Sequence, residues 1–350
     1  ILPKDIDACI ITNPANIRYF TGFSTENGYI IASRNGSVFL TDSRYIEAAQ
    51  AKVDCCDVVE LKNTRELVPK YLKKFNCSSV AVEADFVTVS GLREYGKMFK
   101  PDGFKTVFDG RLDKCIRFLR CTKAEEEVEN IKAAQAIAEK AFNHVIKYIK
   151  PGMTEKEVAL AIDFYMLKNG ADAISFDTIV VSGKKSSLPH GVPDGKIIEF
   201  GDFVTMDFGA VVNGYHSDMT RTVAIGEVST MMADVYSIVL NAQAAAIKTA
   251  CAGVPASTVD FAARSIIDKS GYGHAFGHST GHDVGIEIHE EPQVSPKSGY
   301  TLQAGNIITA EPGIYLPDQF GIRIEDMLLI TEDGNENLTS ATKELLLLNN

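Results

Sequence analysis

The sequence predicts an α/β N-terminal domain with a mixed sheet over residues 1–120, followed by a larger domain of paired helices and sheet segments over residues 121–350. Three observations indicate this. A chain of 350 residues exceeds what one hydrophobic core usually organises. In the first third, short apolar runs alternate with helical stretches, which is typical of layered α/β domains. The stretch Lys123–Ile149 then places apolar residues at helical spacing, with Lys and Glu between them.

The N-terminal elements follow from local patterns. Asn35-Gly36 between two apolar runs predicts a hairpin, and Asn13-Pro14 predicts a turn. Asp113–Thr122 is expected to lead the chain out of the domain. The predicted strands are Ala8–Thr12, Gly28–Ala32, Val38–Thr41, Asp57–Leu61 and Ser79–Glu83, and the predicted helices are Arg44–Lys52, Arg65–Phe75 and Ser90–Phe99. This third contains no Gly-rich phosphate loop and no catalytic set, so we expect a scaffold or dimer-forming role.

The remaining elements alternate helices with strands. Pro151-Gly152 breaks the chain after the long helix, and a Gly/Ser/Pro-rich loop, SGKKSSLPHGVPDGKIIEFGD, is a candidate functional loop. The predicted helices are Lys123–Ile149, Thr154–Asn169, Thr230–Ala252 and Ala256–Ser270, and the predicted strands include Phe176–Val181, Val204–Phe208, Thr222–Ile225 and Asn306–Ala310.

The composition is that of an ordinary globular protein, with 45% hydrophobic and 23% charged residues. A formal net charge of −11 argues against nucleic acid or an acidic membrane surface as the main partner, because phosphate binding needs a basic face. No apolar run reaches the roughly 18 residues of a membrane span, and no signal peptide is visible, although the chain begins at Ile1. Seven scattered cysteines without a C-x-x-C pair predict reduced thiols in a cytoplasmic protein.

Two acidic residues, Asp207 and Asp218, stand in the otherwise apolar strands of FVTMDFGAVVNGYHSDMTRT. A carboxylate in such a setting is costly unless it is paired, hydrogen-bonded or bound to a metal. Two like charges also cannot lie close together without a cation between them. This stretch therefore indicates a cation site.

Further candidates lie downstream. Four of the seven histidines fall between His274 and His289, among glycines that let the backbone approach a ligand closely. Glu311 ends an apolar strand before Pro312-Gly313, and Glu325 is expected within an apolar strand reading GIRIEDMLLI. For either glutamate alone, a paired core carboxylate is the alternative.

Together, Asp207, Asp218, His282, Glu311 and Glu325 supply four carboxylates and one imidazole. An oxygen-rich set with a single nitrogen suits Mn²⁺, and less selectively Co²⁺ or Zn²⁺. Four negative charges can neutralise two divalent cations. The set therefore predicts a two-metal hydrolytic site with the ions roughly 3.5–4 Å apart, sharing a hydroxide.

The order D…D…H…E…E, in the settings MDFG, SDMTRT, GHDVG, AEPGIY and RIED, resembles the metal-dependent pita-bread peptidases. The similarity is greatest to Xaa-Pro aminopeptidase and prolidase, relatives of methionine aminopeptidase. NPANIRYFTGF is similar to the N-terminal domain of the same group, so the resemblance covers the whole chain. It implies a creatinase-like domain at 1–120, an α+β pita-bread catalytic domain at 121–350, peptide substrates with proline at the second position, and a homodimer.

The resemblance also implies roles for the ligands. Asp207 would bind one metal, Asp218 and Glu325 would bridge both, and His282 and Glu311 would complete the other. Glu311 is also the implied acid/base partner of the bridging hydroxide.

Other residues match positions around the site. His190, in SLPHG, resembles a histidine that contacts substrate near the scissile bond. His289 resembles one that stabilises the tetrahedral intermediate. His278 and Arg323 match positions that orient ligands and substrate. Tyr315 is expected to support the site by packing.

Gln293 bears on the subclass. Some prolidases of this group carry an arginine just after HE-x-P, where it can grip the free carboxylate of proline, whereas this chain has HEEPQ. The neutral side chain favours an Xaa-Pro aminopeptidase. The nucleophile in this interpretation is the bridging hydroxide.

Two alternatives stay open: a strict Xaa-Pro dipeptidase and, more remotely, a non-catalytic binding module of the same fold. Creatinase shares the architecture without metal, but the full ligand set argues against it. Asp283, where glycine is frequent among relatives, is expected only to tune the ligand shell.

Overall fold

The computed structural model describes residues 2–349, and the chain divides into two compact units, one ending at Arg120 and the other beginning at Cys121. Each unit is described by itself.

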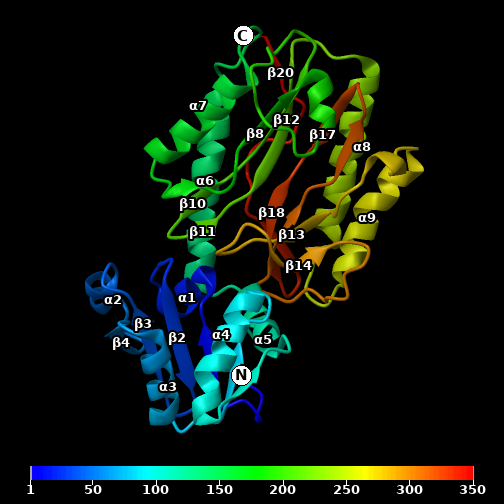
Figure 1. Ribbon diagram of the computed structural model, residues 1–350. Coiled ribbons are helices and arrows are strands. Elements are labelled where there is room, and N and C mark those ends of the chain that lie inside the picture. The colour runs from blue at the N-terminus through cyan, green and yellow to red at the C-terminus, as the bar shows by residue number, and fades with distance from the viewer. Residues whose placement is uncertain (1, 350) are drawn as a thin grey trace. The chain divides into compact units, whose positions relative to one another are not determined.

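The N-terminal unit is an α/β domain built on one six-stranded sheet, drawn in blue to cyan in Figure 1. Its strands are β1 (Ala8–Ile11), β2 (Gly28–Ser33), β3 (Gly36–Thr41), β4 (Asp57–Glu60), β5 (Ser79–Val82) and β6 (Lys105–Val107), and its helices are α1 (Pro14–Thr21), α2 (Ile46–Lys52), α3 (Thr64–Lys74), α4 (Val89–Phe99) and α5 (Arg111–Cys121). The strand order is β4-β3-β2-β1-β5-β6. The β1–β2 and β2–β3 pairs are antiparallel and the other three are parallel, which confirms the predicted mixed sheet.

The central strand β1 is buried on both faces. Ile11 belongs to one apolar cluster and Ile10 to another, because successive side chains of a strand point to opposite faces. Helices cover both clusters. This explains why ACII is a continuous apolar run rather than an alternating one.

Two helices of this unit were not predicted. Asn13 caps α1, its side chain accepting hydrogen bonds from the amides of Ala15 and Asn16, and Pro14 occupies the first helical turn. Asn-Pro predicts a turn, but the same pair also starts helices, because a proline in the first turn loses no hydrogen bond. The stretch expected to be a connector forms α5.

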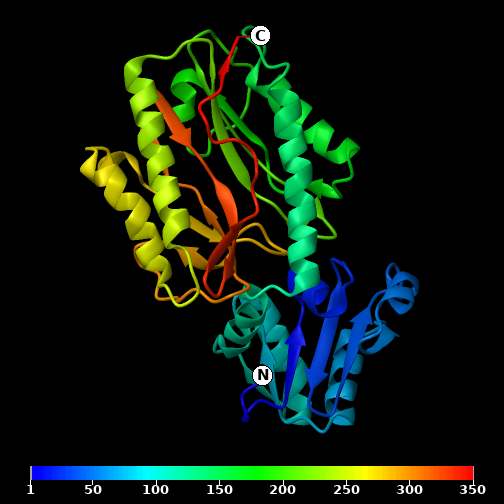
Figure 2. The same cartoon turned by 180° about the vertical axis from the view of Figure 1, so that it is seen from behind.

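The C-terminal unit places its strands between two pairs of helices. The helices are α6 (Glu125–Val145), α7 (Glu155–Lys168), α8 (Thr230–Thr249) and α9 (Ala256–Lys269). Figures 1 and 2 show α6 and α7 on one side of the strands and α8 and α9 on the other. No helix within residues 2–349 is long and apolar enough to cross a membrane.

Within residues 121–349, the strands form four sheets, ordered β20-β12-β9-β8, β11-β10-β7, β14-β13-β15-β18-β19 and β16-β17. They are β7 (Ala173–Ile174), β8 (Ile179–Ser182), β9 (Phe203–Phe208), β10 (Ala210–Val212), β11 (Tyr215–His216), β12 (Met219–Ile225), β13 (Gly281–Asp283), β14 (Glu290–Val294), β15 (Ile307–Ala310), β16 (Gly313–Leu316), β17 (Phe320–Arg323), β18 (Asp326–Thr331), β19 (Gly334–Asn337) and β20 (Leu347–Leu348).

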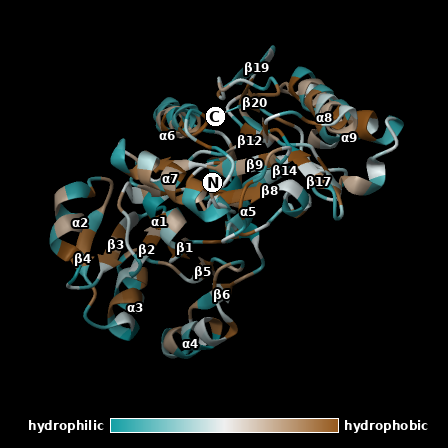
Figure 3. Cartoon of the chain, turned by 90° about the horizontal axis from the view of Figure 1, so that it is seen from above, coloured by the Kyte–Doolittle hydropathy of each residue, from teal (hydrophilic) through white to brown (hydrophobic). Residues whose placement is uncertain are grey.

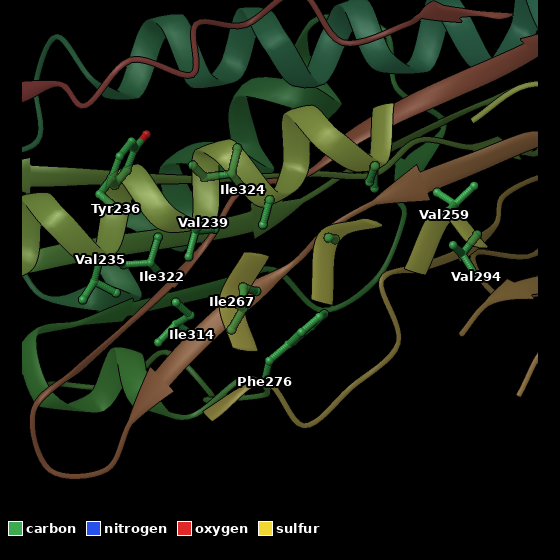
Figure 4. Packing of buried hydrophobic residues seen from close by; sticks show 14 of the residues in the cluster. Val235, Tyr236, Val239, Val259, Ile267, Phe276, Val294, Ile314, Ile322 and Ile324 are labelled. Atoms are coloured by element: carbon green, nitrogen blue, oxygen red, sulfur yellow. The ribbon is translucent and has the colours of Figure 1, made fainter. Parts of the chain in front are cut away.

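Each helix pair covers its own apolar cluster. Under α8 and α9, Val235 and Val239 of α8 belong to the same cluster as Ile314 and Ile322 from β16 and β17 (Figure 4). Under α6 and α7, residues such as Phe142 pack with β8, β9 and β12. Figure 3 shows hydrophobic and hydrophilic residues on the same helices, as expected for helices with one buried face. The two cores hold the strand ends that carry the polar residues described next.

Candidate metal centre

The five predicted metal ligands come from the ends and breaks of strands in the C-terminal unit. Asp207 lies on β9 and Asp218 immediately precedes β12. His282 lies in β13, Glu311 follows β15, and Glu325 lies between β17 and β18. The sequence placed Glu325 inside one strand, and this was wrong, because the chain passes from one sheet to another at that residue.

The structure brings these five side chains together. The Nε2 atom of His282 lies 3.5 Å from Oδ2 of Asp218 and 3.7 Å from Oε1 of Glu311. Ligand atoms of Asp218, His282 and Glu325 all lie within 4.8 Å of one another. Asp207 and Glu311 are close enough that their charges raise the pKa of Asp218.

The electrostatics of the cluster fit a divalent cation. Burial, and then neighbouring carboxylates, raise the pKa of Asp218 and of Glu325 well above the usual range. In the described part of the chain, the buried Oδ1 atoms of Asp207 and Asp218 have no hydrogen-bond partner. Unpaired buried carboxylate oxygens are costly, and a bound cation removes that cost. The residues present therefore fit the metal that the donor set implies.

His282 is oriented for ligation by its own backbone neighbour. Its Nδ1 lies 3.1 Å from the carbonyl oxygen of Asp283, which can only accept. The proton is therefore on Nδ1, and the lone pair of Nε2 faces Asp218 and Glu311.

Thr220 supports the site and was missed by sequence reasoning. Its Oγ1 donates to Oε2 of Glu325 (2.7 Å) and accepts from Nε of Arg323 (3.0 Å). Its carbonyl accepts from the amide of Glu325 (3.1 Å), which holds the chain where it changes sheets. No specific signal in the sequence pointed to it, because β12 reads MTRTVAI and β propensity alone explains a threonine in a strand.

Arg323, Tyr315 and His278 form one hydrogen-bonded chain that ends on a predicted ligand. Nη2 of Arg323 donates to Oδ2 of Asp207 (2.6 Å), and Nη1 donates to the Tyr315 hydroxyl (2.9 Å). Nδ1 of His278 donates to the Ser279 carbonyl (2.8 Å), so Nε2 accepts from the Tyr315 hydroxyl (2.9 Å). Burial raises the pKa of Tyr315 to about 12 and lowers that of His278, which keeps this pattern of donors intact.

His289 and His190 lie nearer the solvent. The ring of His289 meets that of His282 edge-on, with centroids 4.5 Å apart. Burial, and then His282, lower the pKa of His289, favouring its neutral form. His190 is exposed and follows Pro189, whose carbonyl accepts from Nη1 of Arg323 (3.3 Å). The loop that carries His190 is therefore tied to the cluster through Arg323.

Gln293 lies at the edge of the cluster. It is exposed on β14 and directly opposite His282 in the strand pairing. Paired residues on neighbouring strands share a face of the sheet. The position therefore suits a residue that affects which substrates bind.

A buried ion pair involves Asp283, the residue that follows His282. Lys123, which precedes α6, donates from Nζ to Oδ1 of Asp283, and the two side chains are 1% and 0% exposed. Oε2 of Glu290 lies 3.9 Å from the same Nζ. Burial raises the pKa of Asp283 well above its usual range, and the ammonium of Lys123 opposes that rise. Neither Lys123 nor Glu290 was singled out from the sequence.

Substitution of Gly281 by alanine is expected to weaken metal binding. A Cβ atom there would lie 2.0 Å from the backbone oxygen of Thr309 on β15, so β13 must shift, and His282 with it. We expect a loss of about 10- to 100-fold in Mn²⁺ affinity by calorimetry, the usual range when the support of a ligand is lost. Gly277→Ala is the matched control, since nothing lies within 4 Å of its added Cβ. Equal affinities of the two variants would contradict the prediction.

Comparison with known proteins places the chain in a family. Residues 129–332 match Metallopeptidase family M24, and residues 3–110 match the Creatinase/Prolidase N-terminal domain. An Xaa-Pro dipeptidase from Pyrococcus furiosus is 40% identical over 344 residues, which is 98% of this chain and 96% of that protein.

Solved structures are equally similar. The Xaa-Pro dipeptidase from Bacillus anthracis has a TM-score of 0.93 at 39% identity, covering 98% of this chain and 95% of that one. The X-Pro aminopeptidase from Thermotoga maritima has a TM-score of 0.90 at 39% identity, covering 98% and 97%. The resemblance to the pita-bread peptidases is thus confirmed. The M24 match spans more than half of the chain and includes all five clustered side chains, and so the chain belongs to metallopeptidase family M24.

Proposed function

We propose that this metallopeptidase hydrolyses the bond between a residue and proline, with Xaa-Pro dipeptides as its main substrates. The observation that carries the proposal is the cluster of Asp218, His282 and Glu325, whose ligand atoms lie within 4.8 Å of one another. Relatives that cover almost the whole chain are named Xaa-Pro dipeptidases, which supports the substrate.

Two divalent ions, Mn²⁺ in the first instance, are part of the proposal. Asp207, Asp218, His282, Glu311 and Glu325 would hold them. Four carboxylates balance the charge of two such ions. When bound, the ions would supply a water nucleophile at neutral pH and polarise the scissile carbonyl.

The chain's own residues would then move protons and stabilise charge. Glu311, with Oε1 3.7 Å from Nε2 of His282, would take a proton from the attacking water. It would return that proton to the proline nitrogen, because the nitrogen must be protonated to leave the tetrahedral intermediate as an amine. The neutral ring of His289 would donate a hydrogen bond to the developing oxyanion. His190, on its exposed loop, would contact the substrate.

An Xaa-Pro aminopeptidase is the second candidate, and Gln293 favours it. A neutral side chain at the edge of the cluster offers no charge to the free carboxylate of a dipeptide. An X-Pro aminopeptidase is also among the similar structures. The dipeptidase proposal rests on the larger number of similar proteins that are named dipeptidases. The length of the preferred peptide substrate decides between the two candidates.

The test compares an Xaa-Pro dipeptide with an Xaa-Pro-Yaa tripeptide, using protein stripped with chelator and reloaded with Mn²⁺. Mass spectrometry measures kcat/KM for each, and the Asp218→Ala variant is the control. We expect kcat/KM to be at least about tenfold higher for the dipeptide, equivalent to about 1.4 kcal/mol. A preference for the tripeptide would establish the aminopeptidase. Cleavage of neither, with metal bound, would overturn the proposed function and favour a binding module.

The homodimer and the cytoplasmic location expected from the sequence belong to the same proposal. Light scattering of the purified protein tests the first, and a mass equal to one chain would refute it.

A further inference from the structure

We propose that Lys123 and Asp283 act as a positioning pair for His282, fixing its ring so that Nε2 faces the metal. The inference rests on the proposed function, because it takes His282 as a metal ligand. Neither member of the pair would touch the metal or the substrate, so their effect would pass through the backbone.

The pair is enclosed. The side chains of Lys123 and Asp283 are 1% and 0% exposed, and the ammonium donates directly to Oδ1 of the carboxylate. Glu290 adds a second, weaker charge contact at 3.9 Å. The amide of Lys123 also donates to the carbonyl of Gly305 (2.8 Å), just before β15. Lys123 therefore joins the segment before α6, the strand that carries His282, and the segment leading into β15.

The link to the ligand is one hydrogen bond. The carbonyl of Asp283 accepts the Nδ1 proton of His282 at 3.1 Å. Strand pairing alone holds this segment only weakly, because β13 has three residues and its pairing with β14 shifts between His282 and Asp283. Asp283 is the residue of β13 that pairs with β15, opposite Ile308. The position of its carbonyl, and thus the direction of the imidazole, depends on how firmly Asp283 is held.

Loss of the ammonium would release that residue. Oδ2 of Asp283 is buried and already has no hydrogen-bond partner among the described residues. Without Lys123, Oδ1 would lose its donor as well. A buried carboxyl with neither oxygen paired is strongly unfavourable, so Asp283 would move towards water and carry its carbonyl with it. If both members are replaced by apolar residues, no unpaired carboxyl remains to pull residue 283 towards water.

A double-mutant cycle tests this directly. Mn²⁺ affinity is measured by calorimetry on chelator-stripped protein for the wild type, Lys123→Met, Asp283→Val and the double variant. We expect Lys123→Met to bind about 10- to 100-fold more weakly, as when the partner of a ligating histidine is lost. The double variant should recover to within about threefold of the wild type, because a buried ion pair is replaceable by apolar side chains. Valine at 283 suits a strand.

The matched control is Lys132→Met. Lys132 lies on α6, is partly exposed and pairs with Glu129 and Glu336 at the surface. Its Mn²⁺ affinity should equal that of the wild type. The melting temperature of each metal-free protein is recorded in parallel, since a merely structural pair would lower it without changing the affinity of the folded protein.

The outcomes separate this inference from the proposed function. If the wild type binds no Mn²⁺, or His282→Ala binds it equally well, the proposed metal site fails. If the wild type binds and His282→Ala does not, but Lys123→Met binds like the wild type, only the positioning role is refuted. Failure of the double variant to regain affinity would refute it as well. If Lys123→Met does not fold, Asp283→Asn, of nearly the same size, takes its place and must bind more weakly.

Discussion

Glu325→Ala is expected to abolish tight binding of two Mn²⁺ ions and, with it, turnover. Glu325 is 2% exposed, and its Oε2 accepts from Thr220 at 2.7 Å, so its carboxylate is held in one position within the ligand cluster. Glu325 would hold the ions together with the other four side chains, and its loss would remove one of the four negative charges that balance them. We expect kcat/KM at saturating Mn²⁺ to fall by more than about 10³-fold, equivalent to about 4 kcal/mol of transition-state stabilisation. Metal content after dialysis is measured alongside, and Asp218→Ala should behave in the same way.

Glu332→Ala is the control for this experiment. Glu332 is an exposed glutamate just after β18, the strand that follows Glu325, so its loss removes the same charge from the chain but not from the cluster. It should keep wild-type metal content and rate. Full activity of dialysed Glu325→Ala or Asp218→Ala would refute the ligand assignment.

His289→Ala is expected to lower kcat by about 10²- to 10³-fold, the usual cost of removing one donor to an oxyanion, while metal content stays unchanged. The ring lies edge-on to His282, with centroids 4.5 Å apart, and it is exposed rather than enclosed by carboxylates. Its lowered pKa favours the neutral ring, which still has one N–H to donate. Steady-state kinetics give kcat and KM separately, and elemental analysis gives the metal content.

His274→Ala is the matched control, because His274 lies in the same histidine-rich stretch but is exposed in a short helical turn (Gly273–Ala275). It should leave both kcat and metal content unchanged. A His289→Ala protein that no longer retained Mn²⁺ would mean that His289 is a ligand, and its proposed role in the reaction would be withdrawn.

The clustered carboxylates could be predicted from the sequence because each is an acidic residue within or next to an apolar segment. Asp207 interrupts an apolar strand, Asp218 immediately precedes another strand, and Glu311 follows a third, so the residue types and their order predicted a site without coordinates. The break at Glu325 could not be predicted, since GIRIEDMLLI reads as one continuous strand. What divides it is the hydrogen bond from the amide of Glu325 to the carbonyl of Thr220, about which the local pattern says nothing.

The supporting residues were beyond sequence reasoning for a related reason. Lys123 begins a strongly charged stretch and looks like a surface residue, yet it is buried against Asp283, which lies 160 positions later. Burial of a polar residue is decided by its distant partner, and one sequence does not name that partner. The helix α1 was missed for a local reason, since Asn-Pro is compatible with both a turn and a helix start.

The wide spacing of the five ligands along the chain, from Asp207 to Glu325, has a consequence for the stability of the protein. Unfolded or half-folded chains cannot gather these side chains, so the ions of the proposed site would bind the native state alone. Such binding adds RT ln(1 + [L]/Kd) to the free energy of unfolding, about 2.7 kcal/mol when free metal is one hundred times Kd. The supply of divalent metal would then affect how readily each molecule unfolds and is cut by proteases, as well as how fast it works.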